Sequence, residues 1–413
     1  MLIHWIWLAT RPSVSDRQKK LLLDCFDDPE DIFFAEAKAF GCVEGISEDA
    51  IAALEDKNLA EAERILKECM QKGIHICTMH DGAYPARLKN IVDPPSVLYY
   101  KGHLPDLDGS PVIAVVGTRS ASGYGMTVAK RMGYQIARCG GIVVSGLASG
   151  IDAMAMRGAL TAGTPVVGVL GCGADVVYPL SNRSLYADTE KCGCLITEFP
   201  PGTQPMKWNF PKRNRIMSGL SSGVLVVEAP EKSGALITAK QAADQGRDVF
   251  VVPGNIDVPT CVGSNALLRE GAISVMSGWD VVSEYAHLYP QRIRQDNTPA
   301  KQTATAEEVE QAAPARVAQK PQLPQNPARS DKKNGKKPID NRQLEGYIVQ
   351  RQPLPELTED EKRIMEQLTQ EQLVDDLVAK LGLPTPKVLA TLTMLQIKGL
   401  IRQLPGNRVA PSE

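Results

Sequence analysis

The middle of the chain, from residue 111 to 282, repeats one pattern: a short apolar run, a turn that carries glycine, and a stretch with helical spacing. Continuous apolar runs that alternate with helices are typical of parallel strands covered on both faces. We therefore expect an α/β fold whose core is a doubly wound, mostly parallel sheet. The expected strands are Val112–Val116, Ile142–Val144, Val166–Leu170, Leu195–Thr197, Val224–Val227 and Val249–Val252.

Folded segments are expected on both sides of this core. Residues 13–72 have helical spacing and predict a small helical domain, similar to SAM or helix-hairpin-helix folds. A later stretch rich in Pro, Gln, Ala and Lys has few large apolar residues, which indicates a flexible linker. Three helical patterns and a hairpin then suggest a winged helix. The expected domains are the helical domain 1–80, the Rossmann-like domain 81–288 with its lead-in 81–110, the linker 289–353 and the winged helix 354–413.

Apolar runs and cysteines limit the compartment and the cofactors. No apolar run approaches the length of about twenty residues that spans a bilayer, so we expect a cytoplasmic protein without a membrane anchor. Met1–Ala9 is too short for that, and we expect it to be a buried segment.

Nine cysteines are scattered along the chain, and Cys192 and Cys194 form the closest pair. Because no further ligands lie near that pair, we expect buried reduced thiols, no metal site and no cofactor.

The overall charge of −2 hides a difference between segments. Residues 1–108 hold 12 basic and 19 acidic residues, whereas 109–285 hold 15 and 13, and 286–413 hold 19 and 16. A site for a polyanion must therefore be local.

The first expected strand of the core ends in a turn that suits a phosphate. Gly117, Thr118 and Arg119 follow the strand and lead into a helix, whose free amide groups can bind an anion. The spacing departs from GxGxxG, and the next strand ends in Ser145 and Gly146 where a dinucleotide-binding fold would place an acidic residue. NAD binding is therefore disfavoured. Arg119 suits a phosphate, with a surface salt bridge as the alternative.

A basic loop with aromatic residues lies between Gln204 and Ser218. We expect this loop at the carboxyl edge of the sheet, where open α/β folds bind ligands. Cations bind phosphates and aromatic rings stack on exposed bases, which favours single strands over duplexes. The alternative places the rings of Trp208 and Phe210 in the core. No acidic residue occurs from 199 to 227, and the cations of the loop are Lys207, Lys212, Arg213 and Arg215.

A third segment, Glu228–Lys240, is expected to begin a helix near Ser233 and Gly234. Its amide groups and Lys240 can extend the same groove, or Ser233 is simply a helix cap. No catalytic set accompanies these loops, since the sequence lacks Walker A and HExxH motifs. For Asp152 we favour a role in orienting loop amides over general-base catalysis. We therefore expect that the protein is not an enzyme.

Together these motifs resemble the DprA (Smf) family of DNA-processing proteins of bacterial transformation and recombination. The resemblance implies that the Rossmann-like domain binds and protects single-stranded DNA, forms a homodimer, and delivers the strand to RecA. The motifs include Gly117–Arg119, Ser145–Asp152, Phe210–Ile216, Gly234–Thr238 and Val252–Gly254. The expected DNA-binding residues are Gly117, Thr118, Arg119, Ser145, Gly146, Lys207, Asn209, Phe210, Arg213, Asn214, Arg215 and Lys240.

Three positions depart from the pattern of that family. Ser149 and Leu180 stand where the family usually has basic residues, and Met156 replaces a histidine. The affinity for DNA is then expected to depend more on Lys207–Arg215, with Arg183 as a candidate substitute for the charge missing at position 180. From residue 353 on, the chain carries 7 basic and 9 acidic residues. We therefore expect the winged helix to serve a protein contact or self-association, with duplex binding as the alternative.

Two other functions fit the sequence less well. A nucleotide phosphoribohydrolase of the lysine-decarboxylase-like group shares the expected sheet, but its Pro-Gly-Gly-x-Gly-Thr-x-x-Glu signature is missing at residues 228–234. A transcriptional regulator that acts through the winged helix is disfavoured by the negative charge of that segment.

Overall fold

The computed structural model describes residues 1–295 and, toward the C-terminus, 358–368, 370, 372–381, 385–398, 400–404 and 408–411. The chain divides into two compact units, Met1–Ala313 and Pro314–Glu413. The expected linker lies outside the described residues from position 296 on. No helix in the described ranges combines the length and the apolar character needed to cross a bilayer.

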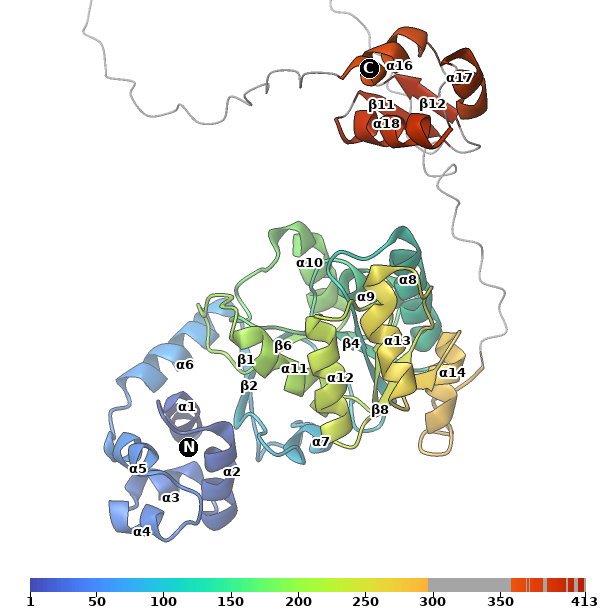
Figure 1. Ribbon diagram of the computed structural model, residues 1–413. Helices are drawn as coiled ribbons and strands as arrows, with labels where there is room; N and C mark the ends of the chain where they lie inside the picture. Colours follow the sequence, from blue (N-terminus) through green and yellow to red (C-terminus); the bar gives the residue numbers. More distant parts are fainter. Residues whose placement is uncertain are drawn as a thin grey trace, which may run out of the picture. The chain divides into compact units, whose positions relative to one another are not determined.

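The first unit is built on a nine-stranded sheet with the order β1-β2-β6-β5-β4-β3-β7-β8-β9 (Figure 1). Strands β3 to β9 run parallel, whereas β2 is antiparallel to both β1 and β6. The predicted doubly wound α/β core is confirmed, and six of its strands, β3 to β8, lie within one residue of their predicted limits. The strands are β1 (His75–Thr78), β2 (Val97–Gly102), β3 (Val112–Val116), β4 (Ile142–Ser145), β5 (Val166–Val169), β6 (Cys194–Thr197), β7 (Gly223–Val226), β8 (Asp248–Val251) and β9 (Ile273–Ser274).

Helices cover both faces of the sheet, which is why its central strands are apolar throughout. Side chains of β3 alternate between two cores: Ala114 and Val116 join the first, and Ile113 and Val115 join the second. The first core also takes side chains from α7, α11 and α12, and the second from α8, α9, α10 and α14. These helices are α7 (Ala86–Lys89), α8 (Gly123–Arg138), α9 (Ile151–Thr161), α10 (Arg183–Cys192), α11 (Asn209–Leu220), α12 (Gly234–Asp244), α13 (Val262–Arg269) and α14 (Gly278–Val282).

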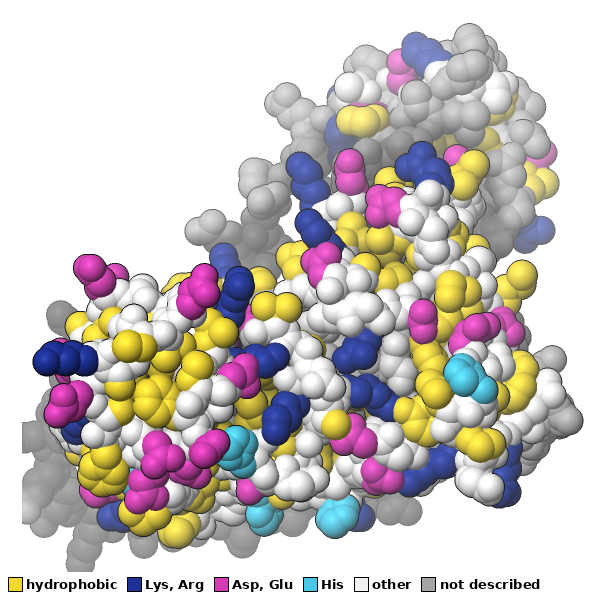
Figure 2. Space-filling model, turned by 90° about the horizontal axis from the view of Figure 1, so that it is seen from below, with side chains coloured by type: hydrophobic (Ala, Val, Ile, Leu, Met, Phe, Trp, Pro, Cys, Tyr) yellow, Lys and Arg dark blue, Asp and Glu magenta, His cyan; other side chains and the backbone are white. Residues whose placement is uncertain are grey.

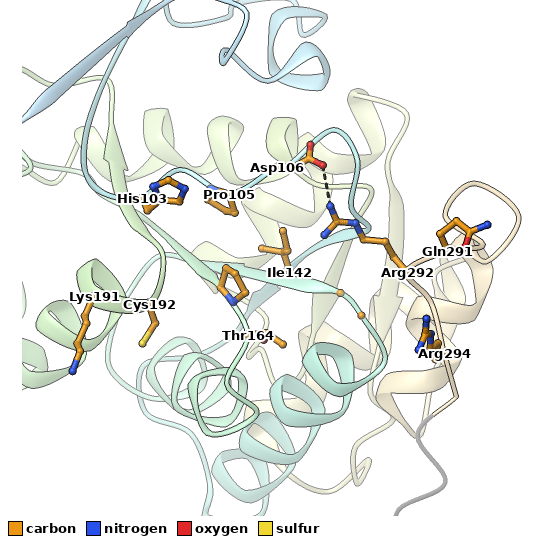
Figure 3. A pocket seen from close by; sticks show the side chains of 13 residues that line it. His103, Pro105, Asp106, Ile142, Thr164, Lys191, Cys192, Gln291, Arg292 and Arg294 are labelled. Atoms are coloured by element: carbon orange, nitrogen blue, oxygen red, sulfur yellow. Dashed lines mark hydrogen bonds and ion pairs between the residues drawn. The ribbon is translucent and has the colours of Figure 1, made fainter.

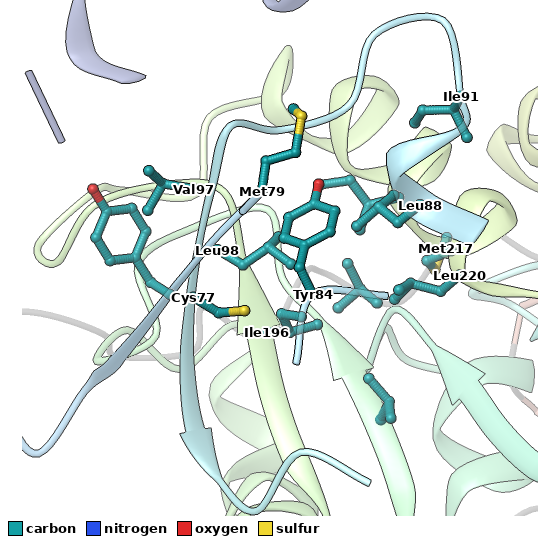
Figure 4. Close-up of a cluster of buried hydrophobic side chains, with 14 of the residues drawn as sticks. Cys77, Met79, Tyr84, Leu88, Ile91, Val97, Leu98, Ile196, Met217 and Leu220 are labelled. Carbon is teal, nitrogen blue, oxygen red and sulfur yellow. The ribbon is translucent and has the colours of Figure 1, made fainter. Parts of the chain in front are cut away.

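The N-terminal helices share the first core with the sheet. The expected buried segment at the N-terminus is α1, whose Trp7 and Leu8 are completely buried in that core. Figure 4 shows a part of the same core in which Leu88, Met217 and Ile196 lie together. The boundary expected at residue 80 comes after β1, and β1 pairs with β2. The last residues of the expected helical domain therefore belong to the sheet. The helices are α1 (Leu2–Thr10), α2 (Asp16–Cys25), α3 (Pro29–Phe34), α4 (Ala37–Gly41), α5 (Glu48–Glu55) and α6 (Ala60–Lys72).

The second unit has the three helices and the hairpin of the predicted winged helix. Its sheet has the order β10-β12-β11, and Pro405 and Gly406 lie outside the described residues. Thr358 caps the first helix through a capping box with Glu361. A separate core includes Leu377 and Leu392. The elements are α16 (Glu359–Gln367), β10 (Gln372–Leu373), α17 (Val374–Leu381), α18 (Thr385–Ile397), β11 (Ile401–Leu404) and β12 (Arg408–Pro411).

The cysteines of the first unit are all free thiols. Six of them are buried, as expected, whereas Cys25, Cys42 and Cys192 are exposed. Cys192 closes α10 and Cys194 opens β6, so the two thiols of the closest pair differ in exposure.

Candidate nucleic-acid interface

A pocket of about 320 Å³ opens where the strand order of the sheet reverses, between β3 and β7. Open α/β sheets bind their ligands at this point, outside the carboxyl ends of the strands. Six of the twelve predicted DNA-binding residues line the pocket, together with Lys232 and Ser233 from the loop after β7 and Gly234 at the start of α12. The six are Gly117, Thr118, Arg119, Phe210, Arg213 and Asn214.

The loop after β3 is held by hydrogen bonds that leave Arg119 exposed. The Thr118 amide donates to the Glu228 carbonyl at 2.7 Å. Ser122 caps α8 by accepting from the Gly125 amide at 2.9 Å. The backbone on both sides of Arg119 is therefore fixed, while its guanidinium points to the pocket from an exposed position.

Phe210 and Arg119 bring an aromatic ring and a cation together at the mouth of the pocket. The guanidinium carbon of Arg119 lies 5.3 Å from the centre of the Phe210 ring. The centres of the Tyr178 and Phe210 rings are 5.6 Å apart. Asn209 fixes the start of α11, because its side-chain amide donates to the Gly171 carbonyl at 3.1 Å. This arrangement can offer one charge to a phosphate and one ring face to a base.

Arg213 is buried beneath the pocket and bonded within the protein. Its guanidinium donates to the carbonyl oxygens of Gly146, at 2.9 Å, and Val169. The Gly146 amide donates to Asp152 at 3.1 Å, so Asp152 orients a loop amide as expected. Burial lowers the pKa of Arg213 and raises the pKa of Asp152, and the attraction between the two opposes both shifts. Ser145 is also buried and donates to the Val115 carbonyl at 2.8 Å.

Arg215 faces the N-terminal helices and does not line the pocket. Its guanidinium pairs with Asp16 of α2 at 2.8 Å, Asp93 at 3.1 Å and Glu198. Burial raises the pKa of the Glu198 carboxyl and of the Asp93 carboxyl. This ion cluster connects α2 with α11.

Other predicted cations lie on the surface outside the pocket lining. Lys207 and Lys240 are exposed. Trp208 is 63% exposed, so its ring does not belong to the core. Leu180 is exposed as well, at 70%. Lys232 also lines the pocket and is not among the residues that the sequence predicts to bind DNA. Its place just before Ser233, the cap of α12, puts a cation beside a helix N-terminus.

A larger pocket, of about 830 Å³, opens at the amino edge of the sheet (Figure 3). Lys191, Arg292 and Arg294 line it, and Arg292 pairs with Asp106 at 3.0 Å. None of the predicted DNA-binding residues lines this pocket, and it lies opposite to the edge where open α/β sheets bind ligands. The candidate site is therefore the smaller pocket.

The surface charge is mixed on the face that Figure 2 shows, where acidic and basic side chains lie beside one another. This pattern agrees with the small net charge of the chain and with a site that depends on local cations.

Comparison with known proteins identifies the family. A family model described as DNA recombination-mediator protein A matches residues 75–286, and one described as DprA winged helix domain matches residues 349–407. The chain belongs to the DprA (Smf) family. The DprA of Bacillus subtilis is 41% identical over 244 residues, which cover 58% of this chain and 82% of that protein. The Smf protein of Synechocystis is 37% identical over 278 residues, covering 66% of this chain and 70% of that one.

A solved structure of a family member has the same architecture. The X-ray structure of DprA from Streptococcus pneumoniae superposes with a TM-score of 0.61 and 32% sequence identity. The likeness covers 69% of this chain and 98% of that chain. The fold of this chain is therefore that of the DprA family.

Proposed function

We propose that this member of the DprA family is a recombination mediator that binds single-stranded DNA at the pocket between β3 and β7. The observation that carries the proposal is the exposed Arg119 guanidinium beside the Phe210 ring, at the switch point of the sheet. Arg119 and Lys232 supply charge for phosphates, and Phe210 supplies a face for a base. Lys207, Trp208 and Lys240 extend this path over the exposed surface, as the sequence predicts.

Within this proposal the buried arginines act by positioning other groups. Arg213 holds the loop after β4 through the Gly146 carbonyl, and Arg215 holds α11 against α2. Contact with DNA falls mainly to Arg119, Lys207 and Phe210, because their side chains are exposed or half-buried.

We extend the proposal to partners that the family resemblance implies. The protein delivers the bound strand to RecA in the cytoplasm, during natural transformation or recombination, and acts as a homodimer through the Rossmann-like domain. Support for a dimer comes from exposed apolar side chains near the β8–β9 edge of the sheet, namely Ile256 at 82%, Val262 at 45% and Met276 at 77% exposure. Large exposed apolar side chains that gather on one surface are typical of protein interfaces.

For the winged helix we propose a protein contact or self-association. Two lysines of its third helix segment are engaged within the same unit, since Lys387 pairs with Asp360 at 2.7 Å and Lys398 with Glu361 at 2.8 Å. A duplex-reading helix needs cations that are free for phosphates. Duplex binding is the alternative.

The test is fluorescence anisotropy of the full chain with a labelled oligo-dT, over a salt series, with duplex DNA and AMP as competitors. We expect tight binding that weakens steeply with salt and survives both competitors. Arg119→Ala should lower the salt slope by about one, and Phe210→Ala should remove the stacking of one base, about 1–3 kcal/mol. Joint substitution of Arg119 and Lys207 by alanine should weaken binding further.

The matched control is Arg131→Ala, which removes one exposed charge from α8 outside the pocket. We expect it to bind oligo-dT as the unchanged protein does. Weak binding that AMP displaces would contradict the proposal and favour a nucleotide-hydrolysing enzyme. An unchanged salt slope in the double variant would show that the binding path lies elsewhere.

A further inference from the structure

Glu228 is a buried carboxylate beside the pocket that the proposed DNA contacts do not use. It follows β7, and its side chain is almost fully buried, at 1% exposure. None of the ion pairs in the described part of the chain involves Glu228. A buried carboxylate without a cation needs hydrogen-bond donors or an oriented dipole to hold its charge.

Both carboxylate oxygens of Glu228 face donors from neighbouring loops. Oε2 accepts the amide of Ser122, the N-cap of α8, at 3.0 Å. Oε1 accepts the hydroxyl of Thr260 and lies 3.8 Å from the Cys261 sulfur. A single side chain therefore joins the loops that follow β3, β7 and β8.

The carboxylate lies against the first turn of α8. A Cβ atom added to Gly125 would come within 1.9 Å of Oε2, so only glycine leaves room for the carboxylate there. The N-terminus of the helix after the first strand is the place where doubly wound folds bind the phosphate of a nucleotide. In this chain the carboxylate of Glu228 occupies that place.

We propose that Glu228 is an internal substitute for a nucleotide phosphate, which makes the site selective for a DNA backbone over free mononucleotides. A mononucleotide cannot put its phosphate at the α8 terminus because the Glu228 carboxylate occupies it. The same loop directs Arg119 outward, where a phosphate of a longer strand can reach it. The inference rests on the proposed function, since it explains which nucleic acid this site accepts.

The experiment compares the full chain with Glu228→Ala and Glu228→Ser, both of which vacate the α8 terminus. Thermal unfolding is followed with and without inorganic phosphate or AMP. We expect either anion at ten times its Kd to raise the melting temperature of both variants by about 3 °C and to leave the unchanged protein unaffected. A variant that folds only in phosphate is the same positive result. AMP should also displace oligo-dT from the variants and not from the unchanged protein.

Glu231→Ala is the matched control, because it removes an exposed carboxylate from the same loop. It should respond to phosphate as the unchanged protein does. If neither Glu228 variant gains a response to phosphate or AMP, or if the unchanged protein already has one, the inference is overturned. Failure of the unchanged protein to bind oligo-dT would instead refute the proposed function, so the two failures are distinguishable.

Discussion

Arg213 and Arg215 show what a residue's type and place in the sequence leave undetermined. Both belong to a basic stretch that the sequence predicts to be a loop with phosphate contacts. The structure instead places them in α11, and both side chains are buried. Residues two positions apart on a helix point in directions about 200° apart. Arg213 therefore meets the sheet edge at Gly146, whereas Arg215 meets Asp16. The sequence predicted the charges, the aromatic rings and the edge of the sheet where they gather. It could not predict that Arg213 and Arg215 are buried, because the groups that accept their hydrogen bonds come from distant segments of the chain.

Arg213→Ala should destabilise the protein by about 3 kcal/mol or more, because Asp152 keeps a buried charge without its partner. Arg119→Ala should change the free energy of unfolding by less than about 0.5 kcal/mol, since its side chain is exposed. Urea unfolding of the two variants measures the difference. Equal stabilities would mean that Arg213 is not needed to hold the loop after β4.

The pH dependence of Arg213→Ala has a definite sign. Burial raises the pKa of Asp152 above 3.8, so the folded protein binds its proton more tightly than the unfolded chain. The contribution of Asp152 to stability is therefore fully present below pH 3.8 and is lost as the pH rises through the folded-state pKa. The deficit of the variant should shrink as the pH falls through that range.

At the scale of elements, strands with continuous apolar sequence were predictable and short or unusual ones were not. Strands β3 to β8 are buried by helices on both faces, which leaves an apolar run in the sequence. β9 has only two residues, both exposed, and therefore leaves no such run. β1 follows α6 closely, and its place in the sheet depends on antiparallel pairing with β2. That pairing is a long-range contact that local patterns do not encode.

Helices α8 and α9 pack with their backbones in contact, and this contact yields a prediction. A Cβ atom on Gly133 would lie 2.1 Å from the Ala155 carbonyl oxygen, and one on Gly158 would lie 2.0 Å from the Lys130 carbonyl oxygen. Gly133→Ala should therefore force the helices apart and cost about 1–3 kcal/mol.

The control for Gly133→Ala lies in the same helix. A Cβ atom on Gly123 meets nothing within 4 Å, so Gly123→Ala should be neutral or stabilise the protein by up to about 1 kcal/mol. Thermal unfolding of the two variants compares them directly. A Gly133→Ala protein as stable as the control would show that the two helices can separate without cost.

At the scale of the whole molecule, each unit has its own core, and the proposed DNA contacts all belong to the first unit. A chain that ends after residue 295 should therefore fold and keep the oligo-dT affinity and the salt slope of the full chain. Anisotropy titrations of the two proteins under identical salt conditions test this expectation. A large loss of affinity would assign part of the binding to the residues that follow.

The first hydrophobic core limits how such a chain can be divided. Its side chains come from the N-terminal helices, from β1 and β2, and from one face of the parallel strands. A chimera that grafted the sheet domain alone onto another N-terminus would cut through this core and leave Leu98 and Ile196 without their cover. Chimeras between relatives should therefore fold when the N-terminal helices and the sheet are transferred together. They should fail to fold when either part is transferred alone.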